Sequence, residues 1–325
     1  MIKLNKNENK NCNKILFKKN EIKQFEYPQG YEHQLIKMIA TRNNIKESFI
    51  TIVNGLDEGI FLFMNFIESK NGKILLDIPN YSGIFAMIQS LKIEAVFNQQ
   101  GEYYDYTSLI TCLENDKTIK FVYISNPRNP YGDYLSEIEN IIKYCNEKNI
   151  IVFLDEAYIE FIGPNSNYVN TSEYNNLIIG RTFSKAYGLA GIRCGYLINC
   201  NKEFQEELNK LRLSQPYHVS EYTLKCALKA YNDIRRLDNG IEKIKKEKEL
   251  LYKTLDNFNI KYIKSDTNFI IVFFEEELTQ FLFNNNILIE QLDKYRQSNG
   301  IRVSIGDKKE MRYLKHLIKT FYGGK

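Results

Sequence analysis

The sequence contains no tryptophan and only six prolines in 325 residues. It also lacks long apolar runs: none approaches the ~20 residues that a membrane-spanning helix requires. Its first 14 residues have neither an apolar core nor a cleavage-site pattern, so they do not resemble a signal peptide. We therefore expect a soluble, intracellular protein.

Cysteine pairs and charge excess are lacking as well. The six cysteines form no C-x-x-C pair, and none lies at ligand spacing from a histidine. This pattern predicts reduced thiols in a cytoplasmic protein, with neither a disulfide framework nor a metal site. The 44 basic and 40 acidic side chains leave a net charge of +4. So mild a charge gives no reason to expect nucleic acid or a membrane surface as a partner.

Hydrophobic residues make up 43% of the chain, enough for a sizeable core. Short apolar runs alternate with amphipathic stretches in the first two thirds of the sequence. The expected strands are Lys73–Ile78, Phe121–Ser125, Ile151–Asp155, Leu177–Thr182 and Cys194–Ile198. The expected helices between them are Gly59–Glu68, Tyr81–Leu91, Ser136–Lys148 and Lys202–Leu211. This alternation predicts an α/β fold with a mainly parallel sheet between layers of helices.

After Pro216 the pattern changes. A charge-rich helical stretch is expected from about Ser220 to Phe258, followed by strands at Phe269–Phe274 and Ile301–Ile305 with a helix after each. We expect a large domain at residues 29–215 and a smaller α+β domain. The smaller domain would combine residues 1–28 and 216–325.

Two loops that follow expected strands carry polar residues of interest. In S-N-P-R-N-P-Y-G, Asn129 stands between two prolines that fix its direction, although a turn asparagine would look the same. In D-E-A-Y, Asp155 ends an apolar strand. Its carboxylate would either cap the next helix or pair with a bound cation such as a cofactor pyridinium. Tyr158 could then donate a hydrogen bond to a phenolate oxygen of the same ring.

A third loop, R-T-F-S-K-A-Y-G-L-A-G-I-R, places Lys185 at a strand end. Lysine forms Schiff bases with carbonyl groups once its ammonium is deprotonated. Ser184 and Arg193 could bind a phosphate nearby, although an exposed lysine and a surface ion pair remain the structural alternative.

A fourth loop, V-N-G-L-D-E-G, leads into a helix whose N-terminus could bind phosphate through backbone N–H groups at Leu56, Asp57 and Glu58. The two acidic side chains also suit a helix start on their own account.

Taken together, these motifs resemble the fold-type I pyridoxal-phosphate (PLP) aminotransferases, and among them the histidinol-phosphate aminotransferase group. The family's motifs occur in order as NPRNPYG, DEAY, SKAYGLAGIR and IRVSIG. Marks of the group are LNKNEN, EYPQG, DEAYIEF, PYHVS and SDTNF. The resemblance covers nearly the whole chain and implies the aspartate-aminotransferase fold, with a seven-stranded, mainly parallel sheet in the large domain.

The resemblance also implies a role for each matching residue. Lys185 would bind the cofactor and move the substrate proton, and Asp155 would pair with the pyridinium nitrogen. Asn129 and Tyr158 would hydrogen-bond the phenolate oxygen. Tyr81 would stack on the ring, and Ser184, Arg193 and the 56–58 backbone would hold the phosphate. Tyr27 would reach the phosphate in the neighbouring subunit of a homodimer. Arg302, with Asn129, would bind the substrate.

The chain departs from the family pattern in two loops. Tyr131 replaces a threonine, which could reshape the entry near the phosphate, and Arg128 is either an extra anion contact or a surface residue. Where the group carries a second arginine that helps bind the substrate phosphate, this chain has Ile289 and Glu290. Losing that contact would weaken the free energy of substrate binding by ~1.5–3 kcal/mol. Nearby cations that could compensate are Lys294 and Arg296.

We therefore expect an aminotransferase that moves an amino group between an amino acid or amino-alcohol phosphate and a 2-oxo acid. The alternative enzyme is a PLP-dependent decarboxylase of a phosphorylated amino acid, such as threonine phosphate or serine phosphate. The alternative without catalysis is a PLP-binding regulator. A regulator is disfavoured because every catalytic position of the motifs is filled.

Overall fold

The computed structural model describes residues 1–325 except 20, 24, 164–172, 297–299 and 324–325. Within the described residues the larger sheet has seven strands in the order β2-β8-β7-β6-β5-β3-β4. They are β2 (Ile50–Val53), β3 (Lys73–Ile78), β4 (Glu94–Gln99), β5 (Ile119–Ser125), β6 (Ile151–Asp155), β7 (Leu177–Thr182) and β8 (Gly195–Asn199). All neighbouring strands are parallel except β8, which runs antiparallel to both β7 and β2.

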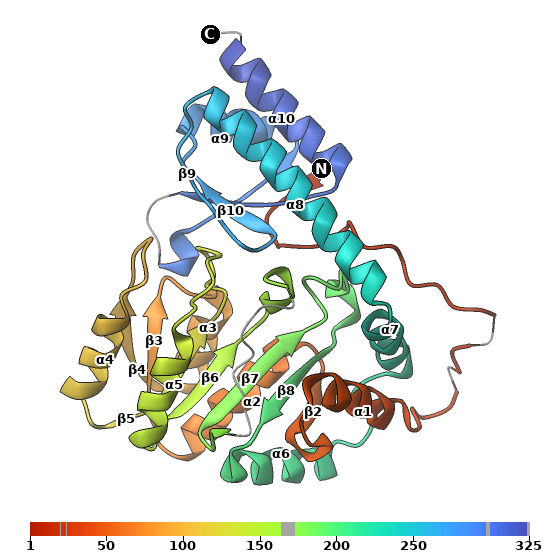
Figure 1. Ribbon diagram of the computed structural model, residues 1–325, viewed down its shortest axis with the longest axis vertical. Coiled ribbons are helices and arrows are strands. Elements are labelled where there is room, and N and C mark those ends of the chain that lie inside the picture. The colour runs from red at the N-terminus through yellow and green to blue at the C-terminus, as the bar shows by residue number, and fades with distance from the viewer. Residues whose placement is uncertain (20, 24, 164–172, 297–299, 324–325) are drawn as a thin grey trace.

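Helices cover both faces of this sheet (Figure 1). Successive strand residues point to opposite faces, so Tyr123 and Val122 of β5 enter different hydrophobic clusters. The cluster that holds Tyr123 includes residues of α2 (Leu56–Ser69), α3 (Ser82–Leu91) and α6 (Lys202–Ser214). The other includes residues of α1 (Tyr31–Asn43), α4 (Tyr106–Asn115), α5 (Ile138–Glu147) and α7 (Glu221–Asn232). The apolar strands are therefore buried on both sides, as parallel strands usually are.

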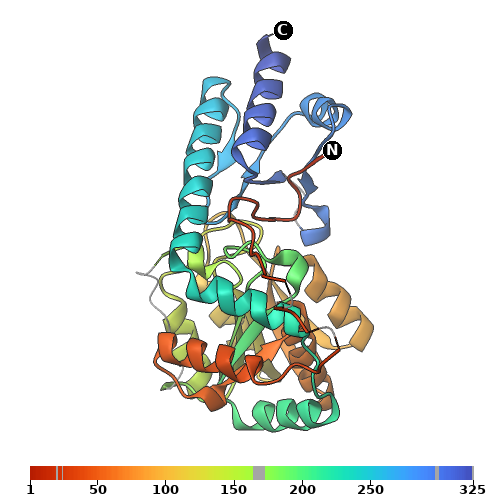
Figure 2. The same ribbon diagram turned by 90° about the vertical axis from the view of Figure 1, so that its right-hand side faces the viewer.

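A second, antiparallel sheet lies above the carboxyl ends of the large sheet in Figures 1 and 2. Its order is β12-β13-β10-β9, and it is accompanied by α8, α9 and α10. The bounds are α8 (Ile234–Asn257), β9 (Tyr262–Ile263), β10 (Phe269–Val272), α9 (Glu276–Asn284), β12 (Glu290–Gln291), β13 (Ile301–Ser304) and α10 (Lys308–Gly323).

The N-terminal segment begins in this upper part. Its strand β1 (Ile2–Lys3) pairs in parallel with β11 (Ile287–Leu288). In both views the segment then runs down past the junction toward α1. The predicted boundaries at 28 and 216 stay predictions.

One expected element is divided. The stretch from Ser220 to Phe258 forms two helices, because the chain breaks at Asp233. The Asp233 carboxylate accepts a hydrogen bond from the Arg236 N–H (2.9 Å) and caps the second helix. In the part of the chain that the structure describes, no helix is long and apolar enough to cross a membrane.

Candidate active site

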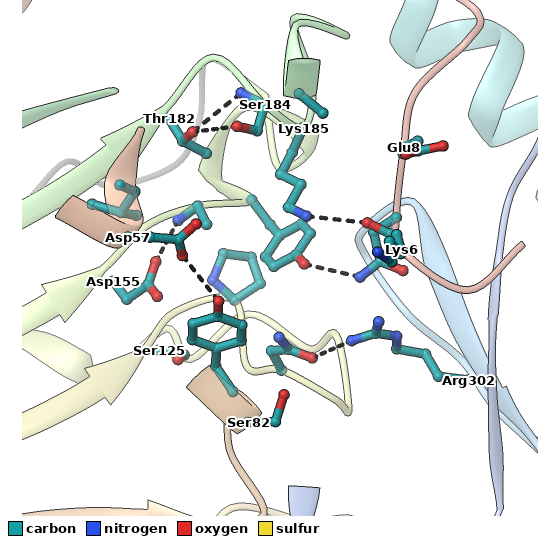
Figure 3. Close-up of a pocket in the computed structure, with 18 of the residues that line it drawn as sticks. Lys6, Glu8, Asp57, Ser82, Ser125, Asp155, Thr182, Ser184, Lys185 and Arg302 are labelled. Atoms are coloured by element: carbon teal, nitrogen blue, oxygen red, sulfur yellow. Dashed lines mark hydrogen bonds between the residues drawn. The ribbon is translucent and has the colours of Figure 1, made fainter. Parts of the chain in front are cut away.

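A cavity of about 580 Å³ opens where the carboxyl ends of the large sheet face the smaller sheet (Figure 3). Ten of the residues singled out in the sequence line it: Leu56, Asp57, Tyr81, Asn129, Asp155, Tyr158, Ser184, Lys185, Arg193 and Arg302. Ligands of open α/β sheets bind beyond the carboxyl ends of the strands, and these residues gather there.

Lys185 follows β7 and reaches into the cavity from above the sheet (Figure 3). Its Nζ donates to the backbone oxygen of Lys6 (3.3 Å) and lies 5.6 Å from the centre of the Tyr158 ring. The amine is thus directed into the cavity, contrary to the alternative of a lysine on the open surface.

Asp155 lies at the end of β6, the strand next to β7. Tyr123 donates to Oδ2 and the Ala157 N–H donates to Oδ1 (2.9 Å). Burial raises the pKa of Asp155 to about 6, and the Tyr123 and Ala157 hydrogen bonds act against that rise. The carboxylate therefore accepts from a turn N–H two residues on and does not cap the next helical turn, whose N-cap is Tyr158. It faces a site where a cation would stabilise its charged form.

The expected phosphate site lies between the loop after β7 and the start of α2. Arg193 donates through Nη1 to Ser184 Oγ (3.3 Å) and through Nη2 to Asp57 Oδ2 (2.8 Å). Thr182, which the sequence reading overlooked, donates through Oγ1 to Ser184 Oγ (3.0 Å) and accepts from its backbone N–H (3.1 Å). The N-cap of α2 is Gly55, which has no side chain to cap the helix, so the first N–H groups of the helix stay available to an anion.

Two more pocket residues are held by hydrogen bonds. The Tyr81 hydroxyl donates to Asp57 Oδ1 (3.0 Å), and burial together with Asp57 raises the pKa of this tyrosine. Arg302, on β13, donates through Nη1 to Asn129 Oδ1 (2.9 Å) and through Nη2 to the Asn5 carbonyl (3.0 Å). Arg302 therefore joins the smaller sheet to both the N-P-R-N-P loop and the N-terminal segment.

Two predicted cofactor contacts do not line this cavity. The Glu58 N–H donates to the Gly55 carbonyl (3.1 Å), and its carboxylate accepts from the Asn54 N–H (2.5 Å). This geometry leaves the Glu58 N–H engaged in the first helical turn. Tyr27 is 72% exposed and stacks on Tyr217, with ring centres 4.8 Å apart. Such a position is the one that contact with another subunit would require.

The structure also shows where the two residues that depart from the family pattern in the N-P-R-N-P-Y-G loop lie. Arg128 is neither an anion contact of the cavity nor a surface residue. It is buried, pairs with Asp133 (2.8 Å) and donates to the carbonyls of Gly101 and Glu102. Tyr131 is buried beneath the Arg128 guanidinium and does not line the cavity, so it does not reshape an entry near the phosphate.

Neither proposed replacement cation can be placed in the cavity. The Arg296 guanidinium lies over the rings of Phe85 and Phe97, at 4.5 and 4.0 Å from their centres, and does not line the cavity. The side chain of Lys294 is outside the described part of the structure.

Some residues of the cavity were not singled out from the sequence. Asn7, buried in the N-terminal segment, donates through Nδ2 to the Tyr158 hydroxyl oxygen (2.9 Å). Tyr295 lies near Arg302 in the wall, which also includes Glu290, the residue already noted where the group carries its second arginine. The L-N-K-N-E-N motif was the one signal that could have drawn attention to Asn7.

The residues present fit pyridoxal phosphate. A buried carboxylate, an amine and an arginine–serine pair occupy one cavity at the ends of adjacent strands, as this cofactor's ring nitrogen, aldehyde and phosphate require. The phosphate end is a cradle: a Cβ atom at Gly55 (φ +82°) would lie 2.3 Å from Arg193 Nη2. Within the described residues, no cluster of three or more His, Cys, Asp or Glu side chains could hold a metal ion.

Fold and site together define a PLP enzyme of the aspartate-aminotransferase fold. A family model described as aminotransferase class I and II matches residues 2–318. The chain belongs to this family and is a PLP-dependent aminotransferase.

Several histidinol-phosphate aminotransferases are similar to this chain over most of its length. The chain is 31% identical, over 94% of its own length and 86% of the relative's, to a protein named histidinol-phosphate aminotransferase 2 from Haemophilus influenzae (strain 86-028NP). The histidinol-phosphate aminotransferase from Clostridium acetobutylicum has a similar structure, with a TM-score of 0.86 at 24% identity and complete coverage of both chains. The PLP complex of the Sinorhizobium meliloti enzyme has a TM-score of 0.81 at 19% identity, covering 98% of this chain and 91% of that one.

Proposed function

We propose that the protein moves an amino group from an amino acid or amino-alcohol phosphate to a 2-oxo acid at this cavity. The observation that carries the proposal is the meeting of Lys185, Asp155 and Arg193 in one cavity. When bound, PLP supplies an electron sink for the bond that breaks at the substrate α-carbon. The surrounding side chains would hold the cofactor, orient the substrate and move its proton.

Each pocket residue has a part in this proposal. Asp155 keeps the ring nitrogen protonated, while Ser184, Arg193 and the Leu56 and Asp57 N–H groups hold the phosphate. Tyr81 would stack on the ring, and Asn129 and Tyr158 would hydrogen-bond its phenolate oxygen. Lys185 would hold the cofactor through its amine, and the same amine would serve as the general base for the proton on the substrate α-carbon.

Arg302 serves as the anion clamp for the substrate. A guanidinium carries five N–H donors, and in this structure two of its nitrogens hold Asn129 and Asn5. The remaining donors suit a carboxylate or phosphate of the amino donor. The proteins named histidinol-phosphate aminotransferase make histidinol phosphate the first donor to test.

We also propose that the active enzyme is a cytoplasmic homodimer. Phe25 and Tyr27 of the N-terminal segment are exposed, as are Leu213 and Tyr217 at and after the end of α6, and the rings of Tyr27 and Tyr217 stack. Groups of exposed large side chains of this kind mark interaction surfaces. In the dimer Tyr27 would reach the cofactor phosphate held by the other subunit. Light scattering on the purified protein tests this, and a monomer that binds PLP fully would refute it.

The test of the reaction is a mass balance. Holoenzyme is mixed with amino donors that include histidinol phosphate, first without and then with 2-oxoglutarate. Amino transfer predicts loss of the visible band of the bound cofactor in the first step and one glutamate per donor consumed in the second. Release of CO₂ without glutamate would instead identify the decarboxylase alternative. Lys185→Ala, which removes the amine, is the control.

A further inference from the structure

Glu290 and Arg302 are direct neighbours across two strands of the smaller sheet. They are paired in the antiparallel register of β12 and β13, both are buried, and both line the cavity. Side chains that are paired in this way project from the same face of a sheet. A carboxylate and a guanidinium therefore stand side by side in the wall that faces the substrate.

The two side chains are held in different ways. Arg302 is fixed from behind by Asn129 and Asn5. Glu290 accepts a hydrogen bond from the Tyr295 hydroxyl (3.2 Å), and the Tyr295 ring lies 4.8 Å from the Arg302 guanidinium. Because Glu290 is buried in this wall and paired in register with Arg302, its carboxyl group lies beside the anion clamp.

We propose that Glu290 sets the substrate class of the cavity. It favours a donor that presents a hydroxyl or a cationic nitrogen to this part of the wall and disfavours a phosphate monoester there. This inference rests on the proposed amino transfer and narrows its donor. A phosphate carries about −1.5 to −2 charges at neutral pH. Held by Arg302, it would lie beside a buried carboxylate, and juxtaposed like charges weaken binding strongly.

Two donors that differ only by the phosphate, histidinol and histidinol phosphate, test the idea. Single-turnover loss of the visible cofactor band in the holoenzyme gives kcat/KM for each donor. We expect wild type to prefer histidinol by about tenfold or more, and Glu290→Gln to raise kcat/KM for histidinol phosphate about tenfold through a lower KM. Asp293→Asn removes the same charge from an exposed position outside the cavity and should leave the ratio unchanged.

A binding measurement separates this inference from the proposed reaction. Phenethyl phosphate has no amino group, so calorimetry on the holoenzyme reports phosphate binding whether or not transfer occurs. We expect binding to Glu290→Gln at least about tenfold tighter than to wild type. If neither donor changes the cofactor band, the protein does not transfer the amino group of these donors. The calorimetry would still test whether Glu290 weakens phosphate binding. Equal affinity of the two proteins, or a wild-type preference for histidinol phosphate, would overturn the inference.

Discussion

The side-chain amide of Asn7 lies 2.9 Å from the hydroxyl oxygen of Tyr158, 151 residues away. Asn7 is the donor in this hydrogen bond, so the Tyr158 oxygen is the acceptor and its own proton is free to point elsewhere. Asn7 Oδ1 in turn accepts from Ser304 Oγ (2.8 Å). The N-terminal segment thus orients a hydroxyl of the cofactor site.

Replacing Asn7 by aspartate should reverse that hydrogen bond. The carboxylate keeps the shape and the Ser304 contact but cannot donate, so Tyr158 would direct its proton toward position 7. We expect about tenfold weaker PLP binding, the value of one hydrogen bond of about 1.4 kcal/mol. Fluorescence titration of the cofactor-free protein measures it. Asn11→Asp, which removes an amide donor to the Gly306 carbonyl without touching Tyr158, is the matched control.

Asp57 and Arg193 should affect cofactor affinity in opposite directions. Arg193→Gln removes a charge-assisted contact to the phosphate and should weaken PLP binding about tenfold to a hundredfold. Asp57→Asn keeps an acceptor for the Tyr81 hydroxyl but removes the carboxylate that now pairs with Arg193. Because that pair is partly exposed, we expect only about twofold to fivefold tighter binding. Weaker binding in Asp57→Asn would show that its carboxylate supports the site.

The sequence predicted the strands that carry the site because most of their residues are apolar and consecutive. The bounds of β3, β6 and β7 match the predicted ranges. Strand β4, at the sheet edge, was missed because its exposed residues interrupt the apolar pattern. The break at Asp233 was missed because apolar spacing continues through it, and a capping carboxylate is not distinct from other acidic residues of a charged helix.

Within the site, the loops after strands were predictable, whereas Arg302 was the one predicted side chain in the opposite wall. Lys185 and Asp155 follow apolar strands, and parallel strands bring their carboxyl ends to one edge. Glu290 and Asn7 reach the cavity only through the pairing of β12 with β13 and the path of the N-terminal segment. Such contacts between distant segments have no local pattern, so composition and periodicity cannot reveal them.

The role of Lys185 makes a direct chemical prediction. Borohydride reduction of the PLP-loaded protein should attach the cofactor to Lys185, and peptide mass mapping should find it there. Lys185→Ala should bind PLP without the visible band of the lysine-bound form. It should lose roughly 10²–10⁴-fold in activity, the range of general acid–base catalysis. Attachment to any other lysine would contradict the assignment.

The last prediction concerns Asp155, whose buried charge should destabilise the cofactor-free protein. Burial raises the pKa of Asp155 to about 6 from an ordinary value of 3.8. An acid with a raised folded-state pKa contributes its stability below the unfolded pKa, and that contribution is lost as the pH rises through about 6. Asp155→Asn removes the ionisation, so the cofactor-free variant should gain stability over wild type at pH 8 and gain less at pH 5.

With PLP bound, Asp155→Asn should instead lower the stability of the protein, because the pyridinium nitrogen would then pair with the wild-type carboxylate. Asp155→Asn loses that pair, and we expect PLP to bind it about tenfold to a hundredfold more weakly than wild type. Thermal unfolding at the two pH values, with and without PLP, measures both effects. Tyr123→Phe removes a hydrogen bond that lowers the Asp155 pKa. In this variant the loss of stability with rising pH should therefore occur at a higher pH than in wild type. Equal pH dependence in wild type and Asp155→Asn would show that this carboxylate is not the group that titrates.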